Sequence, residues 1–215
     1  MQIIKLTMVK EVLLATRNEG KIKEFSTLLS PVFERVISLR ELDTVPDIIE
    51  DGETFKENAL KKARIISGLT QKVTLADDSG LEVESLGGRP GVFSARYAGE
   101  KAGDKENIKK LLKELSGVGD RRARFVCALA LVFPDGLAGL TANGREIVVE
   151  GRCDGIIIDD PRGESGFGYD PVFFLPQIKK TMAELTPEEK NRISHRALAV
   201  RKLITCLKKS RTHNE

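Results

Sequence analysis

The stretch Leu75–Gly80, L-A-D-D-S-G, places two adjacent carboxylates at the end of an apolar run. The run Val73–Ala76 predicts a short buried strand, and the serine and glycine that follow the aspartates predict a tight turn. Neighbouring side chains of a strand point to opposite faces, so Asp77 and Asp78 are expected on different sides, one inward and one facing a cleft. A carboxylate at a strand end can hold a hard cation or take a proton from water. Taken alone, the stretch favours an ordinary turn.

The bulk composition limits the classes of protein that this chain can belong to. Its 215 residues suit one large domain or two lobes, and 40% hydrophobic with 31% charged residues is typical of soluble globular proteins. No apolar run approaches the roughly 20 residues of a membrane span. Met1–Glu11 lacks the pattern of a secretory signal, and Met8 could be an alternative start. We therefore expect residues 1–7 to be an extension and residues 8–215 to form a single domain.

Charge and metal-ligand residues exclude further classes. The net charge of +3 is too small for a protein that binds duplex nucleic acid. The three cysteines Cys127, Cys153 and Cys206 lie far apart, and their odd number fits a reducing cytoplasm. With only His195 and His213, a three-histidine zinc site is excluded.

A phosphate site is predicted near the N-terminus. Val12–Thr16 indicates a buried strand, and Asn18 can cap the helix that follows. A strand, a polar turn and a helix N-terminus form a geometry that receives phosphate, and Lys21 adds a cation. The segment Thr16–Lys21, T-R-N-E-G-K, lacks the first glycine and the final hydroxyl of the P-loop, so that motif is rejected. A capped surface helix with a solvated lysine stays an equal alternative.

The acidic loop Pro46–Gly52 precedes a helix that Thr54 and Glu57 open as a capping box and that extends to about Ser67. Its acids suit the positive end of the helix dipole without any function. Alternatively, one of them reaches Asp78 as a second metal ligand.

Further elements follow from local pattern and capping. Strands are predicted at Val36–Leu39, Ala123–Phe133, Glu146–Glu150 and Gly155–Ile158. Asp104 and Ser194 are predicted to cap helices, and Thr186 followed by Pro187 is predicted as another helix start.

The glycine-rich loop Gly163–Pro171, G-E-S-G-F-G-Y-D-P, lacks G-x-G-x-x-G and is no dinucleotide fingerprint. Phe167 beside glycines can stack on a planar base while backbone N–H groups bond it, although a packed loop explains the pattern equally well. Lys190, His195 and Arg196 crowd the junction of two predicted helices, where charged ends are common.

Six segments in order, from about Leu13 to Arg196, resemble the ITPase-like family of inosine and xanthosine triphosphate pyrophosphatases. Each segment alone is weak, and six at family-like spacing are very specific. They are L-L-A-T-R-N-E-G-K, E-D-G-E-T-F-K-E-N-A, L-A-D-D-S-G-L, G-G-R-P-G-V-F-S-A-R-Y-A-G, G-F-G-Y-D-P-V-F and A-E-L-T-P-E-E-K-N-R-I-S-H-R.

The resemblance implies a two-lobed α/β fold around a long, curved mixed sheet with flanking helices and a nucleotide cleft between the lobes. It implies a cytoplasmic, Mg²⁺-dependent homodimer without nucleic-acid or membrane partners. The implied reaction converts ITP, dITP or XTP to the monophosphate and pyrophosphate, which removes deaminated purines from the nucleotide pool.

The resemblance also assigns roles to residues. Asp78 is implied as the general base and as a magnesium ligand. Substrate contacts are implied at Thr16, Arg17, Asn18, Glu19, Gly20, Lys21, Ser79, Phe167, Gly168, Tyr169, Asp170, Lys190, His195 and Arg196. Many members carry a metal-binding glutamate where this chain has Ile49. We take Glu50 as the second ligand, and water alone is the alternative.

Other functions remain open at this stage. A pyrophosphatase for modified pyrimidine nucleotides and a non-catalytic nucleotide-binding module would keep the same loops. A single-stranded nucleic-acid binder would use Phe167 and Tyr169 as stacking platforms, but only two tyrosines and no tryptophan argue against it.

Overall fold

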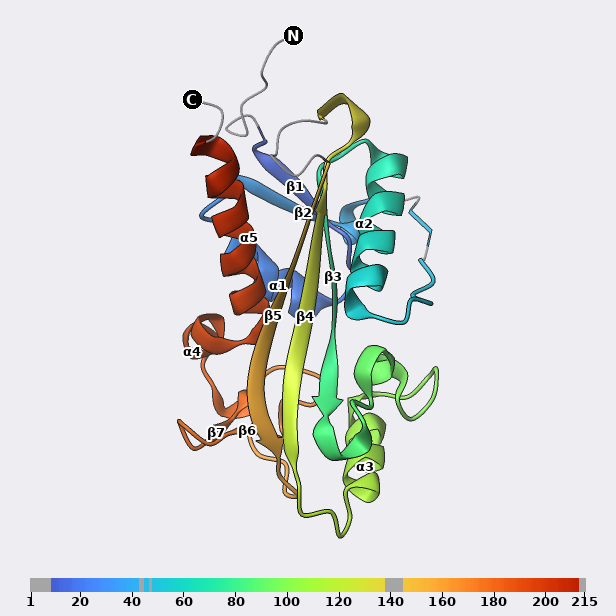
Figure 1. Ribbon diagram of the computed structural model, residues 1–215, viewed down its shortest axis with the longest axis vertical. Coiled ribbons are helices and arrows are strands. Elements are labelled where there is room, and N and C mark those ends of the chain that lie inside the picture. Colours follow the sequence, from blue (N-terminus) through green and yellow to red (C-terminus); the bar gives the residue numbers. More distant parts are fainter. Residues whose placement is uncertain (1–8, 43–44, 47, 138–144, 213–215) are drawn as a thin grey trace. The chain divides into compact units, whose positions relative to one another are not determined.

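The computed structural model describes residues 9–42, 45–46, 48–137 and 145–212 (Figure 1). The predicted extension, residues 1–7, and Met8 lie outside the described residues. Seven strands form one sheet in the order β2-β1-β3-β4-β5-β6-β7. The strands are β1 (Glu11–Leu14), β2 (Arg35–Ser38), β3 (Thr74–Val83), β4 (Arg122–Val132), β5 (Glu146–Ile157), β6 (Phe173–Leu175) and β7 (Lys180–Thr181).

The sheet is mixed, as predicted. β1 pairs in parallel with β2 and β3, whereas β6 pairs antiparallel with both β5 and β7. The helices are α1 (Glu19–Leu29), α2 (Phe55–Thr70), α3 (Asp104–Glu114), α4 (Pro187–Ile193) and α5 (His195–Thr212). The α/β class predicted from the sequence is therefore confirmed. Every helix in the described part of the chain is too short or too polar to span a bilayer.

The chain divides into two compact units. Among the described residues, one unit comprises those within 9–78, 128–151 and 199–212, and the other comprises residues 79–127 and 152–198. The long strands β3, β4 and β5 lie side by side and contribute residues to both units (Figure 1).

Each unit has its own apolar core. In the first unit, Phe25 and Leu29 of α1 and Ala59, Ala63 and Ile66 of α2 are fully buried. The second unit contains a cluster to which β3, β4, α3, the C-terminal part of β5, the glycine-rich loop and β6 contribute. Its members include Leu81, Val83, Ile108, Leu111, Phe125, Tyr169 and Phe173.

The predicted turn after the two aspartates is wrong. β3 continues without interruption from Thr74 through both aspartates to Val83. Leu81 and Val83 are fully buried in the second unit, and the Leu81 N–H donates to the Ser94 hydroxyl at 2.8 Å. Burial and pairing beyond Gly80 thus override the local turn preference of serine and glycine.

Two element boundaries also differ from the prediction. The two strands expected at 146–150 and 155–158 form the single strand β5. Asp104 is the first residue of α3, not its cap, which is Gly103. The capping box at Thr54 and the helix start at Thr186 are confirmed.

Candidate active site

The turn between β1 and α1 has the predicted capped geometry. The Thr16 hydroxyl accepts a hydrogen bond from the Asn18 N–H at 3.2 Å, and the Asn18 side chain accepts one from the Lys21 N–H at 2.9 Å. These local bonds begin α1 directly after a buried strand, so the positive end of the helix faces the turn.

Lys21 is not a solvated surface lysine. Its Nζ lies 2.8 Å from the Asp77 carboxylate, and the side chains of Lys21 and Asp77 are 18% and 0% exposed. Arg17 and Glu19 of the same turn are exposed and contact neighbouring segments. Arg17 donates to the Val45 carbonyl at 2.5 Å, and Glu19 pairs with Arg40. Lys21 is therefore the cation of this turn that pairs with a buried carboxylate.

Asp78 points away from Asp77 and toward α2, as the alternation of a strand requires. Its Oδ2 accepts a hydrogen bond from the Asn58 amide at 3.0 Å, and Asn58 accepts one from the Gly52 N–H at 2.7 Å. A Cβ at Gly52 would lie 2.7 Å from the Asn58 side-chain oxygen, so only glycine allows this approach. Asn58 thus ties the acidic loop to the candidate catalytic carboxylate.

The surroundings of Asp78 shift its proton affinity. Burial raises the pKa of Asp78 to about 6, and the negative charge of Glu50 adds to this rise. The Asn58 hydrogen bond and the charges of Lys21 and Lys62 act in the opposite direction. A carboxyl group with a pKa close to neutral is suited to exchange protons with water.

Lys62 is a site residue that we did not predict from the sequence. It lies one helical turn after Asn58 on α2, pairs with the Glu50 carboxylate, and its side chain is 11% exposed. Burial alone would lower the pKa of Lys62, but the charges of Asp77, Glu50 and Asp78 raise it overall. Lys62 therefore stays an ammonium ion among three carboxylates. The available signal was the i, i+4 spacing of two polar residues on a face of α2 that also buries alanines.

The oxygen ligands near Asp78 fit magnesium. The carboxylates of Glu50 and Asp78 repel each other, and a bound cation would reduce this repulsion. Mg²⁺ is usually bound by one or two carboxylates and completes its shell with water and substrate phosphates. Within the described ranges no cluster of three or more histidine, cysteine or acidic residues could enclose a metal, so a closed protein site is not formed there.

In the second unit, four predicted residues come together around the glycine-rich loop. The Asp170 Oδ2 accepts hydrogen bonds from Lys190 Nζ at 2.7 Å and from the Phe167 N–H at 3.0 Å. Burial raises the pKa of Asp170, and the Lys190 charge opposes this rise. The Phe167 ring lies 5.2 Å from Lys190 Nζ and 4.7 Å from the Arg196 guanidinium carbon. Phe167 therefore lies beside two cations, one from α4 and one from α5.

The remaining predicted residues of this unit are largely buried. His195 is 2% exposed and stacks on Phe125 with a centroid distance of 4.8 Å. Tyr169 is 4% exposed, and its hydroxyl donates to the Ser94 carbonyl at 2.9 Å, so this side chain anchors the loop in the core. Ser79 is half-buried in β3. The structure therefore uses Tyr169 internally, although its substrate contact was predicted from the resemblance.

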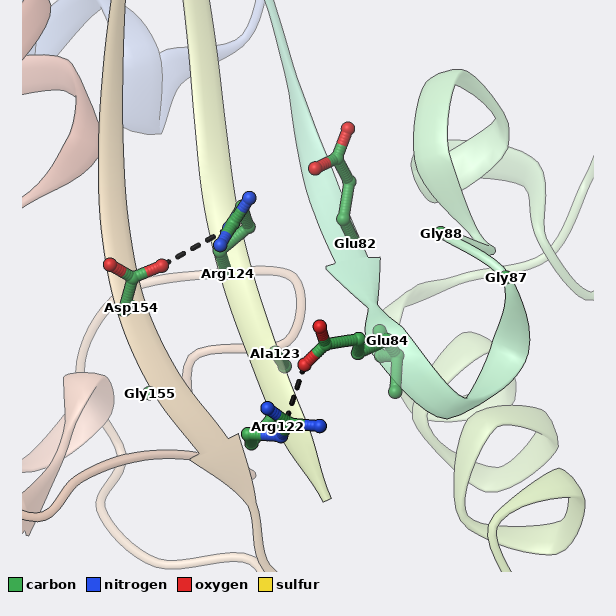
Figure 2. A pocket seen from close by; sticks show the side chains of 10 residues that line it. Glu82, Glu84, Gly87, Gly88, Arg122, Ala123, Arg124, Asp154 and Gly155 are labelled. Atoms are coloured by element: carbon green, nitrogen blue, oxygen red, sulfur yellow. Dashed lines mark hydrogen bonds and ion pairs between the residues drawn. The ribbon is translucent and has the colours of Figure 1, made fainter. Parts of the chain in front are cut away.

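A separate cavity of about 480 Å³ opens over β3, β4 and β5 in the second unit (Figure 2). Figure 2 shows charged side chains of opposite sign along its walls, with Arg122 paired to Glu84 and Arg124 paired to Asp154. None of the predicted site residues lines this cavity. Its arginines are already neutralised by carboxylates, so it offers no excess positive charge for a triphosphate.

Comparison with known proteins identifies the family of the chain. The sequence pattern of the Ham1 family matches residues 12–206. The chain belongs to the Ham1 family. This Ham1-family chain is 54% identical over 198 residues to the dITP/XTP pyrophosphatase of Geobacillus kaustophilus, covering 91% of this chain and 93% of that protein. It is 50% identical over 201 residues to the dITP/XTP pyrophosphatase of Bacillus subtilis, covering 92% and 97% of the two chains.

Solved structures of Ham1 proteins have the same fold as this Ham1-family chain. A HAM1 protein from Coxiella burnetii matches with a TM-score of 0.80 and 43% identity, covering 93% of this chain and 98% of that one. The Staphylococcus aureus Ham1 protein matches with a TM-score of 0.79 and 42% identity, covering 93% and 99% of the two chains. The family predicted from the six sequence segments is therefore confirmed.

Proposed function

We propose that this chain hydrolyses dITP, ITP and XTP to the nucleoside monophosphate and pyrophosphate with the help of Mg²⁺. The observation that carries the proposal is the buried Asp78 carboxylate, held by Asn58 and surrounded by Lys21, Lys62 and Glu50. The relatives that bear the name dITP/XTP pyrophosphatase match more than nine-tenths of the chain, which supports the substrate class.

The triphosphate requires positive charge and hydrogen-bond donors. Lys21 and Lys62 supply two ammonium groups, and the N-terminus of α1 supplies backbone N–H groups. In the structure Lys21 pairs with Asp77 and Lys62 pairs with Glu50. A phosphate oxygen that binds either ammonium group would therefore take the place of a carboxylate oxygen. This exchange leaves the carboxylates available for a cation.

Asp78 acts as the general base. It takes a proton from a water molecule, whose oxygen forms a bond to the α-phosphorus while the bond to the bridging oxygen breaks and pyrophosphate leaves. Asp78 and Glu50 would hold a bound Mg²⁺, which offsets phosphate charge and polarises the α-phosphate. Asn58 keeps the Asp78 carboxylate in one orientation through its amide N–H.

Purine selection is assigned to the second unit. The Phe167 ring offers a stacking surface, and Lys190, His195 and Arg196 offer donors for the 6-keto oxygen of hypoxanthine or xanthine. Adenine carries an amino group there and would leave a buried donor unpaired. Such polar discrimination can reach roughly 10⁴-fold.

A homodimer in the cytoplasm is also proposed, from the family resemblance. Sedimentation equilibrium at micromolar concentration tests the dimer, and a monomer under those conditions contradicts it.

The reaction is tested by pyrophosphate release from dITP, XTP, dGTP and dATP, each with and without Mg²⁺. We expect rapid release from dITP and XTP only when Mg²⁺ is present. Asp78→Asn should lower turnover by roughly 10²-fold or more, the usual scale for a lost general base. Binding of dITP without pyrophosphate release by the wild-type protein would instead identify a nucleotide-binding module. Near-normal turnover by a folded Asp78→Asn protein would remove Asp78 from the role of base.

A further inference from the structure

We infer that Asp104 is a positioning residue for the loop that selects the purine, although it lies on a different element. Asp104 is the first residue of α3, and its Oδ2 accepts a hydrogen bond from the Gly168 N–H at 2.6 Å. The two residues are 64 positions apart in the sequence. The inference rests on the proposed function, because that proposal assigns the purine to the loop around Phe167.

The bond fixes one particular peptide group. The Gly168 N–H and the Phe167 carbonyl belong to the same planar unit. The N–H donates to Asp104, and the carbonyl accepts a hydrogen bond from the Asp170 N–H at 3.3 Å. Because both ends of this plane are held, the direction in which the Phe167 side chain leaves the backbone is held as well.

The backbone conformation at this point is favoured by the sequence. Gly168 has a φ of +61°, and nothing lies within 4 Å of the place that a Cβ would occupy. Glycine is therefore needed for the left-handed conformation and not for space. Because glycine has more backbone freedom than other residues, the peptide group at Gly168 could rotate. The hydrogen bond to Asp104 restricts that rotation.

An acidic residue at the start of a helix has a simpler explanation, which is compensation of the helix dipole. In α3 that role is also filled by Glu106, whose carboxylate accepts a hydrogen bond from the Gly103 N–H at 3.0 Å. Glu106 and Asp104 lie in the same turn and carry the same charge. Of these two carboxylates, the one of Asp104 accepts a hydrogen bond from the glycine-rich loop, so Glu106 is a control for effects of a lost acid on the start of the helix.

The loop has a second anchor that does not depend on Asp104. The Tyr169 hydroxyl donates to the Ser94 carbonyl in the core of the second unit, at 2.9 Å. Loss of the Asp104 oxygen should therefore free the Phe167–Gly168 peptide without releasing the whole loop. The expected consequence is weaker binding of the purine with little change in the chemical step.

The test compares Asp104→Ala, Asp104→Asn and Glu106→Ala. The KM for dITP should rise roughly tenfold in Asp104→Ala, because a hydrogen bond to a charged acceptor is lost. Asp104→Asn keeps an oxygen acceptor and should stay within about threefold of the wild type, since a neutral acceptor makes a weaker bond. Glu106→Ala should keep the wild-type KM. The inhibition constant of inorganic triphosphate, which has no base, should be unchanged in all three variants.

The inference is overturned if Asp104→Ala keeps the wild-type KM, or if its inhibition constant for inorganic triphosphate rises in step with KM. A second measurement does not depend on activity. Exchange of the Gly168 amide hydrogen, followed by NMR, should be faster in Asp104→Ala and unchanged in Glu106→Ala. Unchanged exchange in Asp104→Ala would also contradict the inference. A wild-type protein that does not hydrolyse dITP would refute the proposed function and leave the exchange result to decide the Asp104 contact.

Discussion

Asn58→Asp is the substitution that most directly tests how the candidate base is held. Asn58 is 1% exposed and makes two hydrogen bonds, one to the Asp78 carboxylate and one from the Gly52 N–H. The substitution keeps the size of the side chain and the oxygen that Gly52 needs. It removes the donor that Asp78 needs and places a second carboxylate where the amide nitrogen lies 3.0 Å from Asp78 Oδ2.

The expected magnitudes follow from these contacts. Loss of a hydrogen bond to a charged group, with an acceptor left buried, costs about 2 kcal/mol of the free energy of unfolding. The same interaction orients the base, so its loss should lower kcat for dITP at least roughly tenfold, at 1.4 kcal/mol for each factor of ten. Two carboxylates at this distance also disfavour each other's ionised form. A smaller fraction of Asp78 would then be available as a base, which lowers kcat further.

Asn107→Asp is the matched control. Asn107 is 3% exposed on α3, where it accepts from the Ala98 N–H at 2.8 Å and donates to the Ala95 carbonyl at 3.0 Å. Its substitution also buries a carboxylate in place of an amide, but it touches no carboxylate of the candidate site. Both variants should lose similar stability in urea unfolding, while Asn107→Asp keeps kcat within about twofold.

The assay is pyrophosphate release at saturating dITP and Mg²⁺, with rates corrected for the folded fraction at the assay temperature. If Asn58→Asp and Asn107→Asp lose the same fraction of kcat after this correction, Asn58 acts only through stability. The proposed coupling between Asn58 and the base would then be wrong.

Three further predictions concern single side chains. Glu50→Gln should raise the Mg²⁺ concentration for half-maximal activity roughly tenfold, whereas Asp51→Asn, the neighbouring acid, should leave it unchanged in the same titration. Lys21→Met should lower the free energy of unfolding by about 3 kcal/mol in urea, because it removes the cation of a fully buried carboxylate. Iodoacetamide at pH 8 should label Cys206 before Cys153 in a mass-spectrometric time course. Burial and nearby carboxylates raise the pKa of Cys153 to about 11, which leaves roughly 0.1% of it as thiolate.

The sequence predicted the local elements well where capping and periodicity act within a few residues. The caps at Asn18, Thr54 and Thr186 and the long strand β4 all agree with the structure. The extent of β3 could not be predicted in this way. Its second half is decided by the burial of Leu81 and Val83 against distant segments, and a local turn signal contains no information about those contacts.

In the candidate site, too, the residues could be read from local sequence, whereas their contacts depend on distant segments. Lys21 and Asp77 were each visible in the sequence, but their ion pair depends on how α1 packs beside β3. Asn58 lies in the segment E-D-G-E-T-F-K-E-N-A, but neither Asn58 nor Lys62 was assigned a role, because an amide and an amine on a helix are ordinary surface residues. Only their burial on one face of α2 shows that they surround Asp78. Polar residues at i, i+4 on a face with alanines are therefore a useful signal for such sites.

The acidic loop illustrates what side-chain direction adds to a sequence comparison. The family resemblance places a metal-binding glutamate where this chain has Ile49, and we predicted the adjacent acid, Glu50, as the second ligand. In the structure Ile49 is 75% exposed, whereas the side chains of Glu50 and Asp51 are 30% and 63% exposed. Asp51 pairs with Lys61 on the outer side of α2, and Glu50 pairs with buried Lys62 and repels Asp78. The charge of Glu50 therefore acts on Asp78, and this is why Glu50 remains the second ligand that we propose.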